Sequence, residues 1–301
     1  MLDIKDPKVA IPVVLIAGLF WSFGPYVVRH IDGAQQVPWQ YLFTRGIVIF
    51  IILNLFLYLE EGNEFIKNYT KIGISGAIGG VGLGIAMITF IYSITNTSAA
   101  VTLLCLAAMP FITAMLGFLF LKETISVNVW IAIAIATIGI LIMSADNTGK
   151  NTFTGLIFGI ASSVGFSVFS ISLRWRKETP KFTTVAIAGL FCCVFSAVMI
   201  IMNDLNFLSN GKNQALFATH GTLVCLGLIL YSIGSKNISA AELTLLSLTE
   251  VIGGIFWVWI PILGINEIPS QGTVIGGFFI FISIIYYSLI IRTNRRFIGL
   301  N

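Results

Sequence analysis

Apolar residues in this chain form long unbroken runs that are separated by short polar segments. A helix needs about 20 apolar residues to cross a bilayer, whereas a barrel strand needs roughly 10 that alternate between its two faces. The runs do not alternate, so the pattern predicts membrane-spanning helices, which satisfy every backbone group internally. Ten spans are expected, at residues 10–28, 39–59, 72–94, 97–121, 126–145, 152–173, 182–202, 215–234, 238–263 and 270–291.

Composition supports this interpretation. Hydrophobic residues make up 57% of the 301 residues and charged residues only 10%, with a mean hydropathy of +0.96. A soluble domain is about 25% charged, because its surface faces water. The composition therefore excludes a soluble enzyme, a nucleic-acid-binding protein, a disordered chain and a disulfide-stapled secreted domain. We expect the first span to be retained rather than cleaved, since Trp21, Phe23 and Pro25 stand where a signal peptidase needs small residues.

The distribution of Lys and Arg predicts the orientation. If both termini lie on one side, that side carries 13 of the 17 basic residues and the other side carries three, with Arg45 inside a span. Cytoplasmic loops are enriched in Lys and Arg. Both termini are therefore expected in the cytoplasm of a bacterial cell with the protein in the inner (plasma) membrane, and the net charge of +4 requires no nucleic-acid partner.

The chain also repeats itself at an offset of 139–144 residues. Ser-Ala-Ala occurs at 98–100 and 239–241, each shortly after Tyr-Ser-Ile at 92–94 and 231–233, and Glu123 and Glu267 end the two spans that follow. The repeat predicts two five-helix halves, 10–145 and 152–291. Because five is odd, the second half must be inverted relative to the first. Inverted repeats are typical of alternating-access carriers, whose substrate site lies near the midplane where the halves meet.

Two long segments carry a resemblance to a known family. TSAAVTLLCLAAMPFITAMLGFLFLKE and SAAELTLLSLTEVIGGIFWVWIPILGINE resemble the EamA-like family of the drug/metabolite transporter (DMT) superfamily, and the likeness extends over the whole chain. One departure is Pro110, whose counterpart region holds Glu250-Val251 instead. The resemblance implies the DMT fold, no ATPase, and transport of amino acids or other small metabolites, or exchange of nucleotide-sugars and organic anions.

Ionisable groups inside a bilayer are costly and usually functional. Glu250 lies near the midplane, where its carboxyl group could bind a proton for antiport or pair with a cationic substrate; the alternative is a neutral side chain that hydrogen-bonds a neighbouring helix. Glu242 lies eight residues earlier on the same helix face, where it could relay protons or simply be a solvated helix-start acid.

Arg45 lies six residues into the second span and could bind a substrate carboxylate or phosphate with its planar fork. The alternatives are that it snorkels outward or pairs with Asp32. A gate pair between Arg45 and Glu250 is not favoured, because their estimated depths differ by about 9 Å.

Four further residues are candidates to line a substrate cavity. Trp21 is mid-span, which is unusual for tryptophan, and Trp257 shares the helix face of Glu250; core packing is the alternative for both. Ser163 and Ser167 continue a row of small residues that could face either the cavity or a neighbouring helix.

No cofactor or metal is expected, because the four cysteines fall within spans without ligand spacing. His30 and His220 are assigned to outer loops or span ends, which leaves no reactive cluster for an intramembrane enzyme. The sequence therefore favours a non-enzymatic secondary transporter, an exporter of a small polar metabolite, with protons as a candidate coupling ion. An organic-anion or amine facilitator or exchanger is the alternative. The substrate, and whether the protein is a monomer or a homodimer, stay open.

Overall fold

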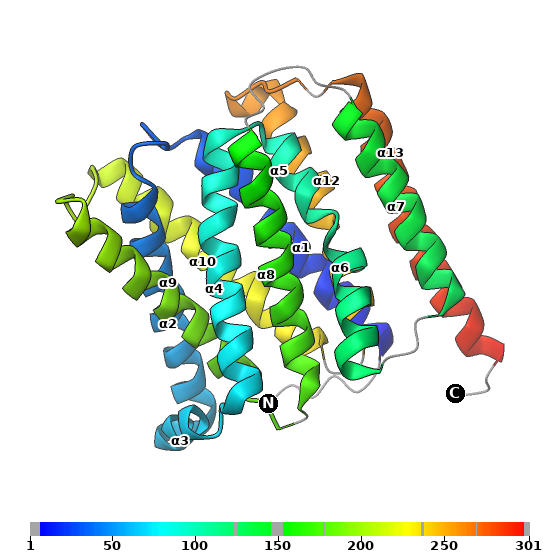
Figure 1. The fold of residues 1–301 in the computed structure, drawn as a ribbon, viewed down its shortest axis with the longest axis horizontal. Helices are drawn as coiled ribbons and strands as arrows, with labels where there is room; N and C mark the ends of the chain where they lie inside the picture. Colours follow the sequence, from blue (N-terminus) through cyan, green and yellow to red (C-terminus); the bar gives the residue numbers. More distant parts are fainter. Residues whose placement is uncertain are drawn as a thin grey trace.

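The computed structural model describes residues 7–122, 126–145, 153–176, 178–235, 238–268 and 270–297, and over these residues the chain is helical without strands. The helices stand roughly side by side in a bundle (Figure 1). They are α1 (Pro7–Arg29), α2 (Pro38–Glu61), α3 (Ile66–Thr70), α4 (Gly73–Asn96), α5 (Ala99–Leu106), α6 (Met109–Leu116), α7 (Val127–Ala145), α8 (Phe153–Trp175), α9 (Lys181–Met202), α10 (Gly211–Gly234), α11 (Ala240–Leu246), α12 (Thr249–Trp259) and α13 (Gln271–Phe297).

Eight helical segments of the described chain are long and apolar enough to cross a membrane. Two further apolar helices, Val127–Gly139 within α7 and Val274–Tyr286 within α13, are shorter. Each segment overlaps one of the ten predicted ranges, although the second continues to Thr70, well beyond its predicted end at residue 59. The structure therefore shows an all-helical, multi-pass membrane protein, with eight candidate spans and two shorter apolar helices in the positions of the fifth and tenth.

The two predicted ranges 97–121 and 238–263 each contain a broken helix. The first breaks between α5 and α6, where Pro110 occupies the second position of α6 and cannot donate a backbone hydrogen bond. The second breaks between α11 and α12 without a proline, and there Ser247 Oγ donates to the carbonyl of Thr244 at 2.8 Å. Such hydroxyl-to-carbonyl bonds compete with the helical ladder and bend helices.

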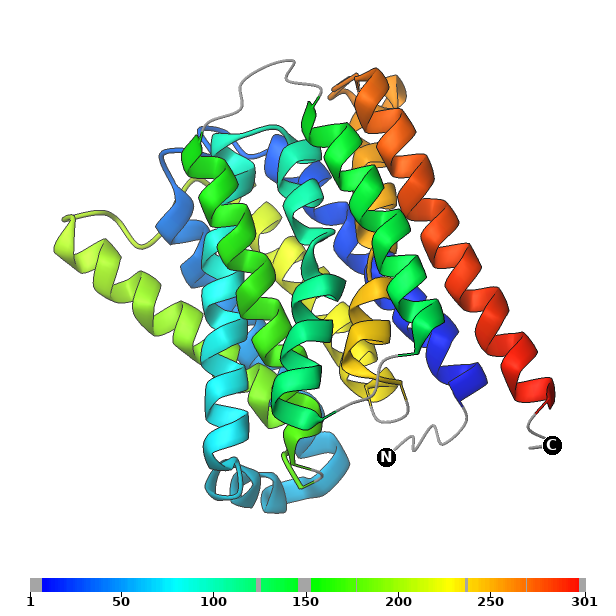
Figure 2. The ribbon, with the colours of Figure 1, turned by 45° about the vertical axis from the view of Figure 1, so that its right-hand side comes forward.

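Helices of the first predicted half of the chain pack mainly against helices of the second. The partners α4 and α8 pack together, as do α1 and α10, while α2 packs on α9 and α7 packs on α13. Figure 2 shows that α1 begins at the end of the bundle where α13 finishes, whereas α8 begins at the opposite end. The contact of α1 with α10 therefore has a counterpart in the contact of α8 with α4, and α1 and α8 begin at opposite ends of the bundle.

The crossing of α2 and α9 depends on two glycines. A Cβ atom on Gly46 would lie 2.7 Å from the carbonyl oxygen of Gly189 and 2.7 Å from the backbone nitrogen of Cys193. Both atoms are backbone, so neither can rotate aside. This is the close approach that small residues permit between membrane helices.

We expect Gly46→Ala to destabilise the protein by about 1–3 kcal/mol, because the added methyl group forces α2 and α9 apart. Thermal unfolding of the detergent-purified protein measures the effect. The matched control is Gly277→Ala in α13, where a Cβ atom meets nothing within 4 Å. An equal unfolding temperature for the two variants would contradict the packing argument.

Candidate functional site

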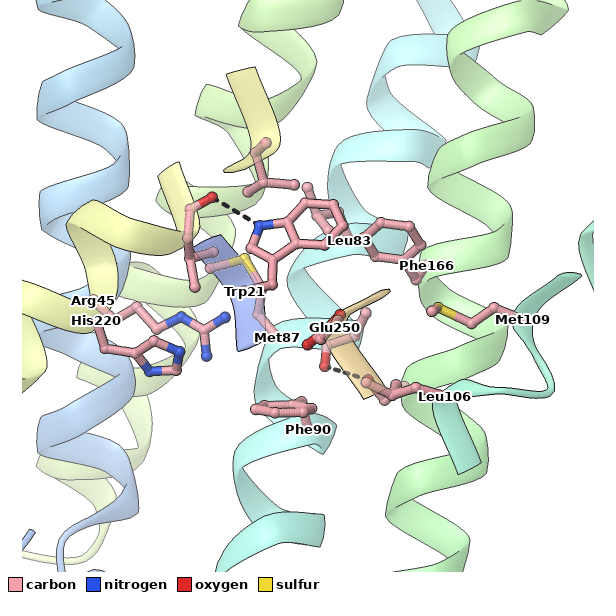
Figure 3. A pocket seen from close by; sticks show the side chains of 14 residues that line it. Trp21, Arg45, Leu83, Met87, Phe90, Leu106, Met109, Phe166, His220 and Glu250 are labelled. Carbon is pink, nitrogen blue, oxygen red and sulfur yellow. Dashed lines mark hydrogen bonds between the residues drawn. The ribbon is translucent and has the colours of Figure 1, made fainter. Parts of the chain in front are cut away.

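A cavity lies in the middle of the bundle, between helices of both halves (Figure 3). The cavity volume that the centres of water molecules can occupy is about 60 Å³. One water needs roughly 10–15 Å³ on this measure, so the cavity holds a few waters and no metabolite unless the helices move. Its lining residues are Trp21, Arg45, Leu83, Ala86, Met87, Phe90, Leu106, Met109, Ser162, Phe166, His220, Val224, Leu228 and Glu250.

The lining reproduces the internal repeat. Several lining residues form pairs separated by 141 positions, which is within the offset of the repeat in the sequence. The pairs are Trp21 with Ser162, Leu83 with Val224, Met87 with Leu228, and Met109 with Glu250. The charged residues do not follow the repeat, because the residue of the first half at the position equivalent to Glu250 is the apolar Met109. The cavity is thus lined from both predicted halves of the chain, while its charged residues have no counterpart of like charge in the lining.

Arg45 extends from α2 into this cavity and is only 4% exposed. Its Nε and Nη1 atoms have no hydrogen-bond partner. Asp32, the partner considered for Arg45 from the sequence, instead forms an ion pair with Lys212, whose Nζ lies 2.7 Å from Asp32 Oδ1. A buried guanidinium with two unsatisfied nitrogen atoms is costly, and such a group is able to bind an anion.

Glu250 enters the cavity from the first turn of α12 and is 9% exposed. Its backbone N–H donates to the carbonyl of Ser247 at 2.9 Å, across the helix break. Arg45 and Glu250 are near enough to interact electrostatically, yet in the described chain no ion pair within 4.0 Å joins them. Both side chains line one cavity, but they do not form the gate pair that the sequence disfavoured.

Trp21 forms part of the wall of the cavity. Its Nε1–H donates to the carbonyl of Val224 at 3.2 Å, and its ring meets Phe166 edge-on at 5.4 Å. The indole lies so close to Gly227 that a Cβ atom there would be 2.2 Å from Nε1. Trp21 is thus a fixed apolar wall with its polar atom already satisfied.

His220 is a cavity residue that the sequence interpretation missed. It is the tenth residue of α10 and only 1% exposed, so its assignment to an outer loop or span end was wrong. Its Nδ1 is hydrogen-bonded to the hydroxyl of Tyr41, which stacks on Phe217. A polar residue inside the predicted span 215–234 was the available signal. The described residues contain no group of three or more His, Cys, Asp or Glu placed to hold a metal.

Ser163 and Ser167 face a neighbouring helix rather than the cavity lining. Ser163 Oγ donates to the carbonyl of Cys105 at 2.6 Å, and Ser167 Oγ lies 2.7 Å from the carbonyl of Ser163 and 3.3 Å from that of Met109. These bonds tie α8 to the broken helix α5–α6. The structure therefore gives both serines packing contacts.

Trp257 and Glu242 also lie outside the lining. Trp257 Nε1 donates to Ser22 Oγ at 2.8 Å, and its ring stacks on Phe23 at 4.6 Å. Glu242 accepts the backbone N–H of Ser239 at 3.1 Å in a capping box at the start of α11. Of the predicted site residues, the structure brings together Trp21, Arg45 and Glu250, and adds His220.

Known proteins resemble this chain in sequence and in fold. Residues 8–145 match the model of the EamA-like transporter family. Two proteins named uncharacterized transporter, from Helicobacter pylori strains J99 / ATCC 700824 and ATCC 700392 / 26695, are each 26% identical over 202 residues, which is 67% of this chain and 67% of theirs. A solved crystal structure covers 95% of this chain and 98% of its own, with a TM-score of 0.74 at 17% identity, which shows the fold alone. The resemblance to the EamA-like transporter family is therefore confirmed over residues 8–145, and the family match and the names of the relatives indicate a membrane transporter.

Proposed function

We propose that the protein is a secondary transporter that exports a small polar metabolite by alternating access. In this proposal the chain has ten spans and the DMT fold, arranged as two inverted five-helix repeats, 10–145 and 152–291. The equivalent packing of corresponding helices and the opposite directions of α1 and α8 support the repeat. Two such halves can exchange conformations, which gives inward-open and outward-open states from one fold.

The observation that carries the proposal is the guanidinium of Arg45, whose Nε and Nη1 atoms have no hydrogen-bond partner, in a cavity lined by helices of both halves. An uncompensated buried charge is costly, and within a membrane such a residue marks a substrate pathway. The planar fork of arginine matches a carboxylate in two parallel hydrogen bonds. In this proposal Arg45 therefore binds the carboxylate group of the substrate.

Glu250 and the apolar lining define the rest of the proposed substrate. Ten of the fourteen lining residues are apolar or aromatic, so the substrate has an apolar body. Glu250 faces the same space and would hold either a coupling proton or a substrate ammonium group. An amino acid or a related solute satisfies both charged residues. An organic anion would use Arg45 alone, which is the alternative that this observation favours.

The proposed orientation places both termini in the cytoplasm and the protein in the inner membrane. The bias of basic residues toward the side of the termini supports it. Because the cavity is smaller than a metabolite, opening it requires the halves to move, as a carrier does.

A thermal-shift panel tests this proposal. We expect amino acids and organic acids to raise the unfolding temperature, because a ligand at ten times its dissociation constant adds about 1.4 kcal/mol to stability. Each amino acid is compared with its amide and with its decarboxylated amine. Stabilisation by the amines but not by the acids would contradict the assignment of Arg45 to a carboxylate.

A further inference from the structure

At the end of the bundle opposite the termini, one carboxylate joins the two halves of the chain. Glu267 Oε2 accepts a hydrogen bond from Arg29 Nε at 3.0 Å, and Glu267 Oε1 accepts the backbone N–H of Ala99 at 3.1 Å. The backbone N–H of Glu267 donates to the carbonyl of Val258 at 2.8 Å, which fixes the residue to α12. Arg29 and Ala99 belong to the first half and Glu267 to the second.

Arg29 is itself held within the first half. It ends α1 and donates from Nη1 to the carbonyl of Ile94 at 2.9 Å and from Nη2 to the carbonyl of Thr97 at 3.1 Å, where α4 ends. The guanidinium thus joins the end of α1 to the end of α4, and its Nε–H donates to Glu267. We call Arg29, Ile94 and Thr97 the outer clasp.

The other half builds the same arrangement at its own end. Arg174, in the last turn of α8, donates to the carbonyls of Ser235 and Ile238. These two acceptors lie 141 residues after Ile94 and Thr97. Because the acceptors stand at equivalent positions of the repeat, and the arginine lies in the last turn of the first long helix of each half, the contact is a repeated feature of the fold rather than a property of one loop.

We propose that Glu267 is the outer latch of the transport cycle: its carboxylate closes the outer end by binding α12 of the second half to the outer clasp and to the start of α5, and it releases when the cavity opens outward. The proposal rests on the alternating-access function proposed above. Both latched elements lead to the cavity, since α12 carries Glu250 and α5 ends at Leu106.

The strength of the contact suits repeated opening. The side chains of Arg29 and Glu267 are 23% and 29% exposed, so water and salt partly screen the ion pair and keep its contribution small. A fully buried pair would be costly to break in every cycle. The latch is therefore strong enough to bias the closed state and weak enough to open.

A second ion pair between the halves supplies a matched control. Lys212 contacts Asp32 at 2.7 Å, and their side chains are 57% and 59% exposed. Asp32 is also held through its backbone, because its N–H donates to Asn213 Oδ1 and its carbonyl accepts from Asn213 Nδ2, both at 3.0 Å. Asp32→Asn removes the same charge as Glu267→Gln, yet leaves the contact between the halves in place.

Labelling of a cysteine in the cavity tests the latch without any substrate. Ser162→Cys places the reporter on the cavity wall, and the parent protein with its natural cysteines is the blank. A membrane-impermeant maleimide is added to right-side-out and to inside-out vesicles. Glu267→Gln is expected to raise the labelling rate from the outside about two- to five-fold, since loss of a partly exposed ion pair shifts an equilibrium by that much. Asp32→Asn should leave the rate unchanged.

Three results would overturn the proposal. One is an unchanged outside labelling rate in both Glu267→Gln and Arg29→Gln. Another is a lower unfolding temperature with no change in labelling, which would make Glu267 a structural residue. The third is a rise only in inside-out vesicles, which would place the contact at the cytoplasmic end. A latch effect in a protein that binds nothing in the thermal-shift panel would count against the proposed function and not against the latch.

Discussion

Replacing Arg45 by methionine is expected to weaken carboxylate binding at least about tenfold while leaving the protein as stable as before, or more so. A charge-assisted hydrogen bond contributes about 1.5–3 kcal/mol, so losing the paired bonds of a guanidinium is a large effect on affinity. The folded protein loses little, because Arg45 Nε and Nη1 bond nothing and the side chain is buried. Replacing unsatisfied buried charge with an apolar side chain of similar length is often stabilising.

The measurement pairs two readouts on the same samples. Dissociation constants are determined for the carboxylates that stabilise the wild-type protein in the thermal-shift panel and for their amides, and unfolding temperatures are recorded without ligand. Arg45→Lys should bind carboxylates with intermediate affinity, since an ammonium group keeps the charge but loses the fork. The control is Lys212→Met, which removes an exposed cation at the bundle end. A marked loss of stability in Arg45→Met, with acids and amides equally affected, would make Arg45 structural.

Hydropathy was sufficient to predict most helix boundaries, because the free energy of placing a residue in lipid depends mainly on that residue and its neighbours in sequence. The range 72–94 became Gly73–Asn96, and 182–202 became Lys181–Met202. The breaks in the fourth and ninth ranges were harder. The first break is predictable from Pro110. The second break has no proline and coincides with one hydroxyl contact of Ser247, and serines elsewhere in the chain lie in unbroken helices.

The sequence could identify those site residues whose type alone is unusual in a span. Arg45 and Glu250 are conspicuous because charge is costly there, but it was not predicted that they line one cavity, since the depth estimate treats every helix as a straight rod. His220 was missed because α10 begins at Gly211, four residues before the predicted start, which puts His220 about one helical turn deeper.

The row of small residues in α8 had two interpretations that periodicity could not separate. Ser163 and Ser167 have the same spacing whether they face a cavity or a helix, and only the positions of Cys105 and Met109 decide it. Such tertiary contacts lie far apart in sequence. The face that a helix turns inward is therefore predictable from its pattern, whereas the identity of what lies opposite is not.

The second large effect concerns Glu250. Glu250→Gln is expected to abolish substrate-driven proton movement while preserving the fold and substrate binding through Arg45. Glutamine has nearly the same shape and keeps a carbonyl oxygen, but it cannot exchange a proton. Because Glu250 is the buried carboxyl group among the residues lining the cavity, its loss removes the group that could couple proton and substrate in one space.

Proteoliposomes loaded with a pH-sensitive dye measure the effect, with the carboxylates identified in the thermal-shift panel as substrates. The control is Glu242→Gln, the other coupling candidate. Glutamine can keep the capping box of Ser239 through its side-chain oxygen, so the variant should lose only the charge at the helix start, about 0.3–1 kcal/mol of stability, and leave proton movement intact. The opposite pattern, with coupling lost in Glu242→Gln and kept in Glu250→Gln, would move the proton site to the start of α11. If wild-type protein transports substrate without moving protons, and Glu250→Gln selectively weakens substrates that carry an ammonium group, then Glu250 binds the substrate and the carrier is a facilitator.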